Sequence, residues 1–262
     1  MNDKVNGDLD TGAENLTSAD SGAPGRIGWP WGANRPTTVR RILVASAVAV
    51  ACGLVLGFGP SVGGTDHTDF GEVWFGAKTM LQHRNPYARV GPGLEFNWDW
   101  GLFYPGTALA LAIPVAGMSE TTASTAFVMF GVWLVVFGST RTSWHRLPAF
   151  ASAAFVIAVR AGQWSPLIAA GWFVPTAAIA WGSKPTLGLA MLLAAPTSRH
   201  RFFAIVGGIV LVAISMALLP SWPWDWAGKL SETEHMVPPF LQPGGFLIAL
   251  ALLRWRTPEA AL

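Results

Sequence analysis

The run from Ile42 to Phe58 constrains the fold more than any other stretch of this chain, because it carries no charged side chain. At roughly 1.5 Å per residue, a helix of this length approaches the ~30 Å thickness of the hydrocarbon core of a bilayer. The run from Phe202 to Leu219 is also uncharged. Neither run alternates polar and apolar residues as barrel strands do, and a membrane admits only helices or closed barrels as spanning structures. We therefore predict helices that cross a membrane.

The composition supports a polytopic, all-α membrane protein. Charged residues make up 12% of the 262 residues, and mean hydropathy is +0.40. Soluble domains more usually contain about 25% charged residues. The single cysteine, Cys52, lies inside the first apolar run, so the chain has no intrachain disulfide and no cysteine-based metal cluster. We interpret Cys52 as a packing or lipid-facing residue.

Arginines stand at the ends of the apolar runs and predict the topology. The pairs are Arg40 and Arg41, Arg199 and Arg201, and Arg254 and Arg256. Because positive charge favours the cytoplasmic side, this pattern indicates topology rather than a nucleic-acid surface. We predict a multi-pass protein of the cytoplasmic membrane, with residues 1–37 as a disordered cytoplasmic tail and residues 38–262 as the transmembrane domain. The chain after the first span then lies on the outer face.

The outer stretch begins with a segment that has helical periodicity. Between Asp69 and His83, one apolar stripe is predicted, and Glu72 lies away from it on the solvated face. Such a helix would lie on the membrane surface and stop at Asn85-Pro86. The members of the stripe are Phe70, Val73, Trp74, Ala77 and Leu81.

The apolar segment from Leu102 to Gly117 is not predicted to cross the membrane. It is short for a span and contains Pro105 and Pro114. We assign residues 61–117 to one outer unit with surface helices, so that 121–139 forms the second crossing and returns the chain to the arginine-rich side. Residues 165–196 are predicted to contain one crossing and a broken segment. Residues 220–243 form a second outer loop, and 244–253 begin a last apolar segment.

Half of the acidic side chains beyond the tail lie between Ser61 and Pro105, and two of them admit a catalytic reading. Asp66 and Asp69 follow the first span closely. Asp69, or its neighbour Thr68, could simply cap the surface helix. Alternatively, one of these carboxylates could remove a proton from an incoming hydroxyl group. Asp66, His67 and Asp69 could in principle bind a divalent cation through two carboxylates and an imidazole, but such ions usually need more oxygen ligands, and we predict no metal site and no cofactor.

Lys184 is a lone cation within a long apolar stretch, where a charge costs about 2.5 kcal/mol or more at the bilayer centre. It could snorkel to the interface, or it could pair with an anion such as a lipid phosphate. Gln163 stands at an expected outer helix end, where it could bind a sugar or cap a turn. Asn97 and Asp99 are placed similarly among tryptophans, which suit both sugar stacking and membrane anchoring.

A series of short motifs resembles glycosyltransferase family 87, a GT-C-type family of integral membrane enzymes that use polyprenyl-phosphate sugars. In chain order the motifs are Asp69-Phe70 followed by Trp74-Phe75, Asn85-Pro86-Tyr87, Phe103-Tyr104-Pro105, Gly162-Gln163 and Lys184-Pro185. Gly106 stands where the family commonly has a second proline. The chain also ends earlier than relatives usually do, which predicts a truncated member.

The resemblance implies a GT-C-like fold and a hexosyltransferase, mannosyltransferase-like, that acts on the outer face of the membrane. Its donor would be a polyprenyl-phosphate sugar, and its acceptor would be a hydroxyl of a glycan or glycolipid. We expect membrane lipid as a further partner and expect no binding of nucleic acid. Asp69 matches the expected general base, with Asp66 as the near alternative, and Lys184 with Arg160 would stabilise the leaving phosphate. The remaining substrate-binding candidates are Gln163, Tyr104, Asn97, Asp99 and Tyr87.

Two other classes of protein compete with the enzyme. A transporter or lipid-binding membrane protein could use Lys184 and the outer acids as a substrate path, but the chain shows neither internal repeats nor acids within its apolar runs. A structural membrane subunit has no need of an acid-rich surface helix. The enzyme requires Asp69 or Asp66 to face a cavity that is open to both lipid and water.

Overall fold

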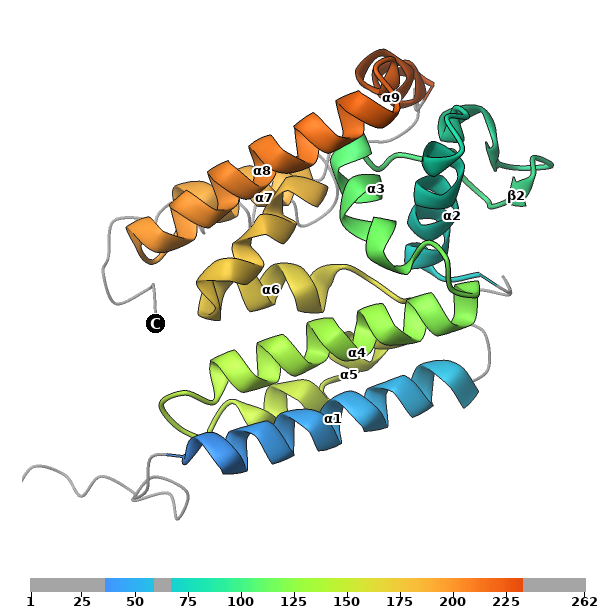
Figure 1. The fold of residues 1–262 in the computed structure, drawn as a ribbon. Helices are drawn as coiled ribbons and strands as arrows, with labels where there is room; N and C mark the ends of the chain where they lie inside the picture. Colours follow the sequence, from blue (N-terminus) through green and yellow to red (C-terminus); the bar gives the residue numbers. More distant parts are fainter. Residues whose placement is uncertain (1–35, 59–66, 233–262) are drawn as a thin grey trace, which may run out of the picture.

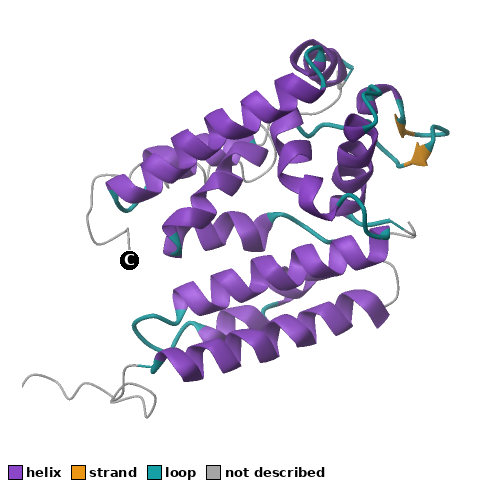
Figure 2. Ribbon diagram, in the orientation of Figure 1, coloured by secondary structure: helices purple, strands orange, loops and turns teal. Residues whose placement is uncertain are grey.

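The computed structural model describes residues 36–58 and 67–232, and this part of the chain is mostly helical (Figures 1 and 2). Residues 1–35 of the predicted tail, Asp66 and the last apolar segment lie outside the described residues. The longer helices are α1 (Thr38–Phe58), α2 (Asp69–Leu81), α4 (Glu120–Ser139), α8 (Ser198–Leu218) and α9 (Trp222–Ser231). The shorter ones are η1 (Pro86–Ala88), α3 (Gly106–Ala112), η2 (Ile113–Val115), η3 (Leu147–Ala151), α5 (Ala153–Arg160), α6 (Ser165–Phe173), η4 (Pro175–Ser183) and α7 (Pro185–Leu193).

Three helices within the described residues are long and apolar enough to cross a membrane, namely α1, α4 and α8. Only 17% of the most apolar stretch of α1, and the same share of α8, is buried inside the protein. Large apolar side chains therefore face outward, as at Phe58, which is 86% exposed, and Ile209, which is 64% exposed. Continuous apolar surface of this kind is typical of contact with lipid. These observations agree with the predicted helical membrane protein.

The apolar stretch from 165 to 196 is broken, as its prolines predict, but none of its helices is long enough by itself to be the crossing that was predicted there. α5 and α6 are bent by 118° and together count as at most one further span. α6 ends before Pro175, which opens η4, and α7 starts at Pro185. A proline ring disfavours the helical conformation in the residue before it, so each proline ends the preceding segment and starts a new one.

The segment from Leu102 to Gly117 is also too short to cross. It forms α3 and then η2, which together extend only from Gly106 to Val115. Ahead of it, two-residue strands pair with each other, β1 (Val90–Gly91) and β2 (Phe96–Asn97). Figure 1 shows this small ribbon beyond α2, away from the long helices.

Helix α2 forms where it was predicted, but the prediction of a solvated face at Glu72 is wrong. α2 packs against both α3 and α4, and Glu72 is only 5% exposed. Leu81, which was placed on the apolar stripe, is instead 42% exposed, and Met80 is buried in its place. The physical reason is that α3 and the start of α4 cover a second side of α2, so more than one stripe is removed from solvent.

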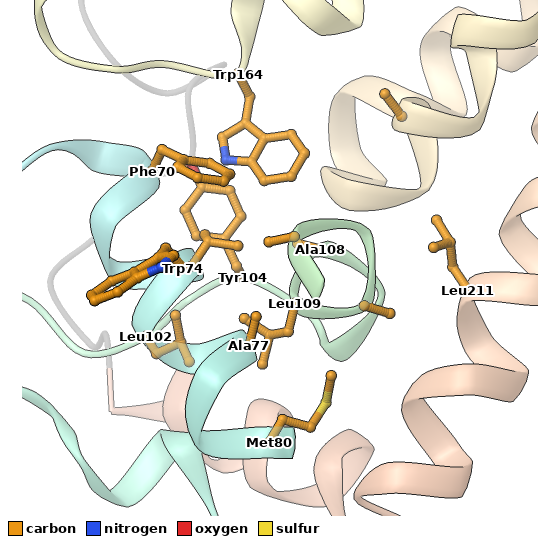
Figure 3. Close-up of a cluster of buried hydrophobic side chains, with 14 of the residues drawn as sticks. Phe70, Trp74, Ala77, Met80, Leu102, Tyr104, Ala108, Leu109, Trp164 and Leu211 are labelled. Carbon is orange, nitrogen blue, oxygen red and sulfur yellow. The ribbon is translucent and has the colours of Figure 1, made fainter. Parts of the chain in front are cut away.

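The core around α2 is aromatic. Figure 3 shows Phe70, Trp74, Tyr104 and Trp164 lying together beside the start of α3. The ring centroids of Tyr104 and Trp164 are 5.8 Å apart, and those of Phe70 and Trp164 are 6.0 Å apart. Ring pairs at such distances add stabilisation beyond the area that they bury. This cluster fixes the loop residues that carry the candidate site.

Candidate functional site

Thr68, not Asp69, caps helix α2. The Thr68 hydroxyl oxygen accepts a hydrogen bond from the Gly71 amide over 3.0 Å, and it also contacts the Ser124 hydroxyl at 2.9 Å. The Asp69 amide donates to the Ala161 carbonyl over 2.8 Å. Thr68 therefore occupies the N-cap position, and the Asp69 carboxylate is available for other contacts.

The Asp69 carboxylate meets side chains from two distant segments. Tyr104 donates its hydroxyl hydrogen to Asp69 Oδ2 over 2.8 Å. Lys184 Nζ lies 3.8 Å from the same oxygen and 4.9 Å from the centre of the Tyr104 ring. The Asp69 side chain is 27% exposed and that of Lys184 30% exposed. The three groups form a half-buried cluster with one carboxylate, one ammonium and one phenol.

Burial raises the pKa of the Asp69 carboxyl above its usual range. The Lys184 ammonium and the hydrogen bond from Tyr104 both oppose this rise, because each favours the ionised carboxylate. A carboxylate with a raised pKa is a stronger base than one in water, and it still carries its charge once the pH exceeds that pKa. Such a group is suited to general base chemistry.

A buried hydrogen bond holds the backbone of Tyr104 in this position. The Tyr87 hydroxyl donates to the Tyr104 carbonyl over 3.0 Å, and Tyr87 is 1% exposed. Tyr87 was predicted to bind substrate, and in the structure its side chain is buried. Tyr87 supports the backbone of Tyr104, because the Tyr87 hydroxyl donates its hydrogen bond to the Tyr104 carbonyl.

Lys184 lies between two helices, η4 and α7, and contacts on either side fix the loop that carries it. Pro185 follows it, and Lys184 adopts φ −128° and ψ 87°, outside the helical region. The Thr107 hydroxyl donates to the Gly182 carbonyl over 2.7 Å, which ties this loop to α3. Trp181 is 2% exposed and donates its indole N–H to the Ile168 carbonyl over 3.0 Å. The apolar stretch is therefore broken at a fixed point, next to Asp69.

Gly162 packs directly against the N-cap of α2 and has a left-handed backbone, with φ +65°. A Cβ there would lie 2.8 Å from Thr68 Cβ. The resemblance motif Gly162-Gln163 therefore has a structural explanation at its first residue. Only glycine combines this φ with such a close approach.

We expect Gly162→Ala to destabilise the protein by about 1–3 kcal/mol, because the left-handed conformation is strained for alanine and the methyl group displaces Thr68. Thermal unfolding in detergent measures this change. Gly228→Ala is the matched control, since a Cβ at Gly228 meets open space within α9. Equal melting temperatures for the two variants would contradict the assignment.

The remaining predicted site residues belong to the segment around α5 and α6 or to the small ribbon beyond α2. Gln163 is half-buried and accepts a hydrogen bond from Ser165 over 3.3 Å. Arg160 ends α5, is half-buried and has no ion pair with any described residue. Asn97 and Asp99 are exposed, at β2 and just after it, and the Asn97 side chain accepts from the Gly93 amide. The structure thus joins Tyr104 and Lys184 to Asp69, and it places Asn97 and Asp99 on the outlying ribbon.

Sequence reasoning missed two features of this region. Glu72 lies one helical turn after the half-buried Asp69 and is itself buried. Only the packing of α3 and α4 on α2 removes it from solvent. The pairing of His67 Nδ1 with Glu120, at 3.0 Å, links the chain before α2 to the start of α4. Within the described ranges, no three His, Cys, Asp or Glu side chains are grouped so as to hold a metal ion.

Gly106, the departure from the family's double proline, contacts Trp222 of α9. A Cβ at this position would lie 2.6 Å from an indole ring atom of Trp222. The indole N–H of Trp226 donates to the Phe103 carbonyl over 2.8 Å. Helix α9 therefore closes over the segment that carries Tyr104, and a larger residue at 106 would displace it.

The chain matches no protein-family model, no curated protein and no solved structure.

Proposed function

We propose that this protein is a GT-C-like membrane glycosyltransferase that moves a hexose, in the first instance mannose, from a polyprenyl-phosphate donor to an acceptor hydroxyl. One observation supports this most directly. The Asp69 carboxylate lies within 2.8 Å of the Tyr104 hydroxyl and 3.8 Å of Lys184 Nζ. Each of these residues belongs to a separate motif of the family 87 resemblance. Motifs that were matched only in chain order thus share one cluster in space.

The proposed chemistry needs a base and a cation on either side of the sugar carbon. Asp69 takes the proton from the acceptor hydroxyl as the acceptor oxygen forms its bond to the anomeric carbon. The bond from that carbon to the phosphate oxygen breaks, with inversion, and polyprenyl phosphate leaves with one more negative charge. Lys184 neutralises that developing charge. In this scheme Lys184 leaves Asp69 for the phosphate when the donor binds.

The charge distribution supports a site on the outer face and a cytoplasmic N-terminus. Arg41, near the start of α1, donates to the Phe137 carbonyl near the end of α4. Thr68, beside the site, contacts Ser124 near the start of α4. The arginines and the Asp69 cluster therefore lie toward opposite ends of α4. If the arginine end is cytoplasmic, the site faces outward.

Membranes that contain the wild-type protein are expected to transfer mannose from polyprenyl-phosphate mannose to an endogenous glycan or glycolipid acceptor. They should not use a nucleotide-linked mannose directly, because the chain lacks the glycine-rich loops that bind nucleotide phosphates. Radiolabel in the acceptor fraction, compared with membranes lacking the protein, measures transfer. Transfer from the nucleotide donor alone would overturn the proposal, and donor binding without transfer would favour a non-catalytic lipid-binding protein.

A further inference from the structure

Glu72 is a buried acid that the proposed reaction does not use. Its residue surface is 5% exposed, and Glu72 Oε2 has no hydrogen-bond partner within the described part of the chain. It stands one turn after Asp69 on the same helix. A buried ionised carboxylate without a full set of partners is costly, so such a group favours its neutral form.

The charged and titratable groups around Glu72 come from several elements. Asp69 precedes it on α2, Tyr104 comes from the segment before α3, and Lys184 comes from the break between η4 and α7. The Glu120 carboxylate, from α4, lies against Gly71 and contacts His67. Burial, and then the charge of Asp69, raise the pKa of Glu72 well above its usual range, while Lys184 opposes the rise.

We propose that Glu72 is a protonated carboxylic acid in the working site, and that its neutrality leaves Lys184 available to the phosphate of an anionic donor. The inference rests on the proposed function for the identity of that donor. Glu72 then acts through its charge, which affects Lys184 and Asp69, and it does not touch the reacting atoms.

The charges of the cluster explain why this proton matters. With Glu72 neutral, the Lys184 ammonium balances the single charge of Asp69, and the donor phosphodiester adds one negative charge. With Glu72 ionised, two carboxylates compete for one ammonium, and the phosphate enters a site that is already negative. Like charges within one partly buried cluster repel more strongly than they would in water. Donor affinity is therefore expected to fall as rising pH removes the Glu72 proton.

Glu72→Gln keeps the shape of the neutral acid and removes its titration. In the wild type, we expect the KM for polyprenyl-phosphate mannose to rise roughly tenfold as the pH rises through the range in which Glu72 ionises, with a smaller change in kcat. In Glu72→Gln, KM should stay flat over that range. A merely structural role for Glu72 would not alter the pH dependence of KM, so superimposable profiles for the two proteins would overturn the inference.

A second measurement does not depend on transfer activity. The infrared difference spectrum between the wild type and Glu72→Gln, in detergent at neutral pH, is expected to show the carbonyl band of a protonated acid. Glu95→Gln is the control and should remove a carboxylate band, because the hydrogen bond from Arg89 lowers the pKa of the exposed Glu95. A carboxylate band assigned to Glu72 would overturn the inference. Absence of transfer with the acid band present would refute the proposed function alone.

Discussion

Asp69→Asn is expected to reduce the rate of sugar transfer by about 10²–10⁴-fold, which is the usual contribution of a general base. The asparagine side chain has nearly the same shape, and its carbonyl oxygen can still accept the hydrogen bond from Tyr104. It cannot take the proton of the acceptor hydroxyl at any accessible pH. The loss should therefore appear in kcat, with a smaller change in the KM for the donor.

Two variants test whether this loss belongs to Asp69 in particular. Glu95→Gln removes an exposed carboxylate on the outlying ribbon and should transfer at the wild-type rate. Asp66→Asn examines the near alternative, whose position lies outside the described residues. If transfer survives in Asp69→Asn at normal protein levels but fails in Asp66→Asn, the base has been assigned to the wrong residue.

Lys184→Met is expected to lower transfer by about 10²–10³-fold, the range seen when one group that stabilises transition-state charge is removed. It should also move the acidic limb of the rate profile to higher pH. Lys184 lowers the pKa of Asp69, so its removal allows that pKa to rise further, and a higher pH is then needed to ionise the base. A pH series of kcat/KM measures both effects.

Further variants separate the two roles of Lys184. Tyr104→Phe removes the hydrogen bond that lowers the pKa of Asp69, so its acidic limb should shift in the same direction without loss of the phosphate contact. Lys78→Met removes an exposed lysine of α2 and should change neither quantity. An acidic limb that stays in place in Lys184→Met would contradict the electrostatic coupling of Lys184 to Asp69.

Much of the fold could be predicted from the chain because lipid imposes simple rules. The uncharged runs became α1 and α8, and Pro175 and Pro185 broke the stretch between 165 and 196 where they stand. Periodicity also predicted α2. It could not predict that α2 is covered on more than one side, because which neighbours pack on a helix is set by contacts between distant segments.

For the candidate site, the sequence supplied the residue types but not their grouping. Lys184 stood out as a lone cation, and Asp69 as one of a few acids near a predicted helix start. Asn97, Asp99 and Tyr87 looked equally suitable. The sequence alone does not reveal that Asn97 and Asp99 are exposed on the outlying ribbon or that Tyr87 is buried. The contact of Lys184 with Asp69 depends on the break before Pro185 and on the bond from Thr107.

The sequence by itself determined that this chain forms apolar helices with a broken segment among them. Lipid excludes water, so unpaired backbone groups and lone charges are energetically costly there, and a proline interrupts the backbone hydrogen bonds of a helix. Only the tertiary structure decided which carboxylate meets Lys184 and that Glu72 is buried beside it. Those outcomes depend on how α2, α3, α4 and the loop before α7 pack together, and burial of that kind sets the protonation of each acid.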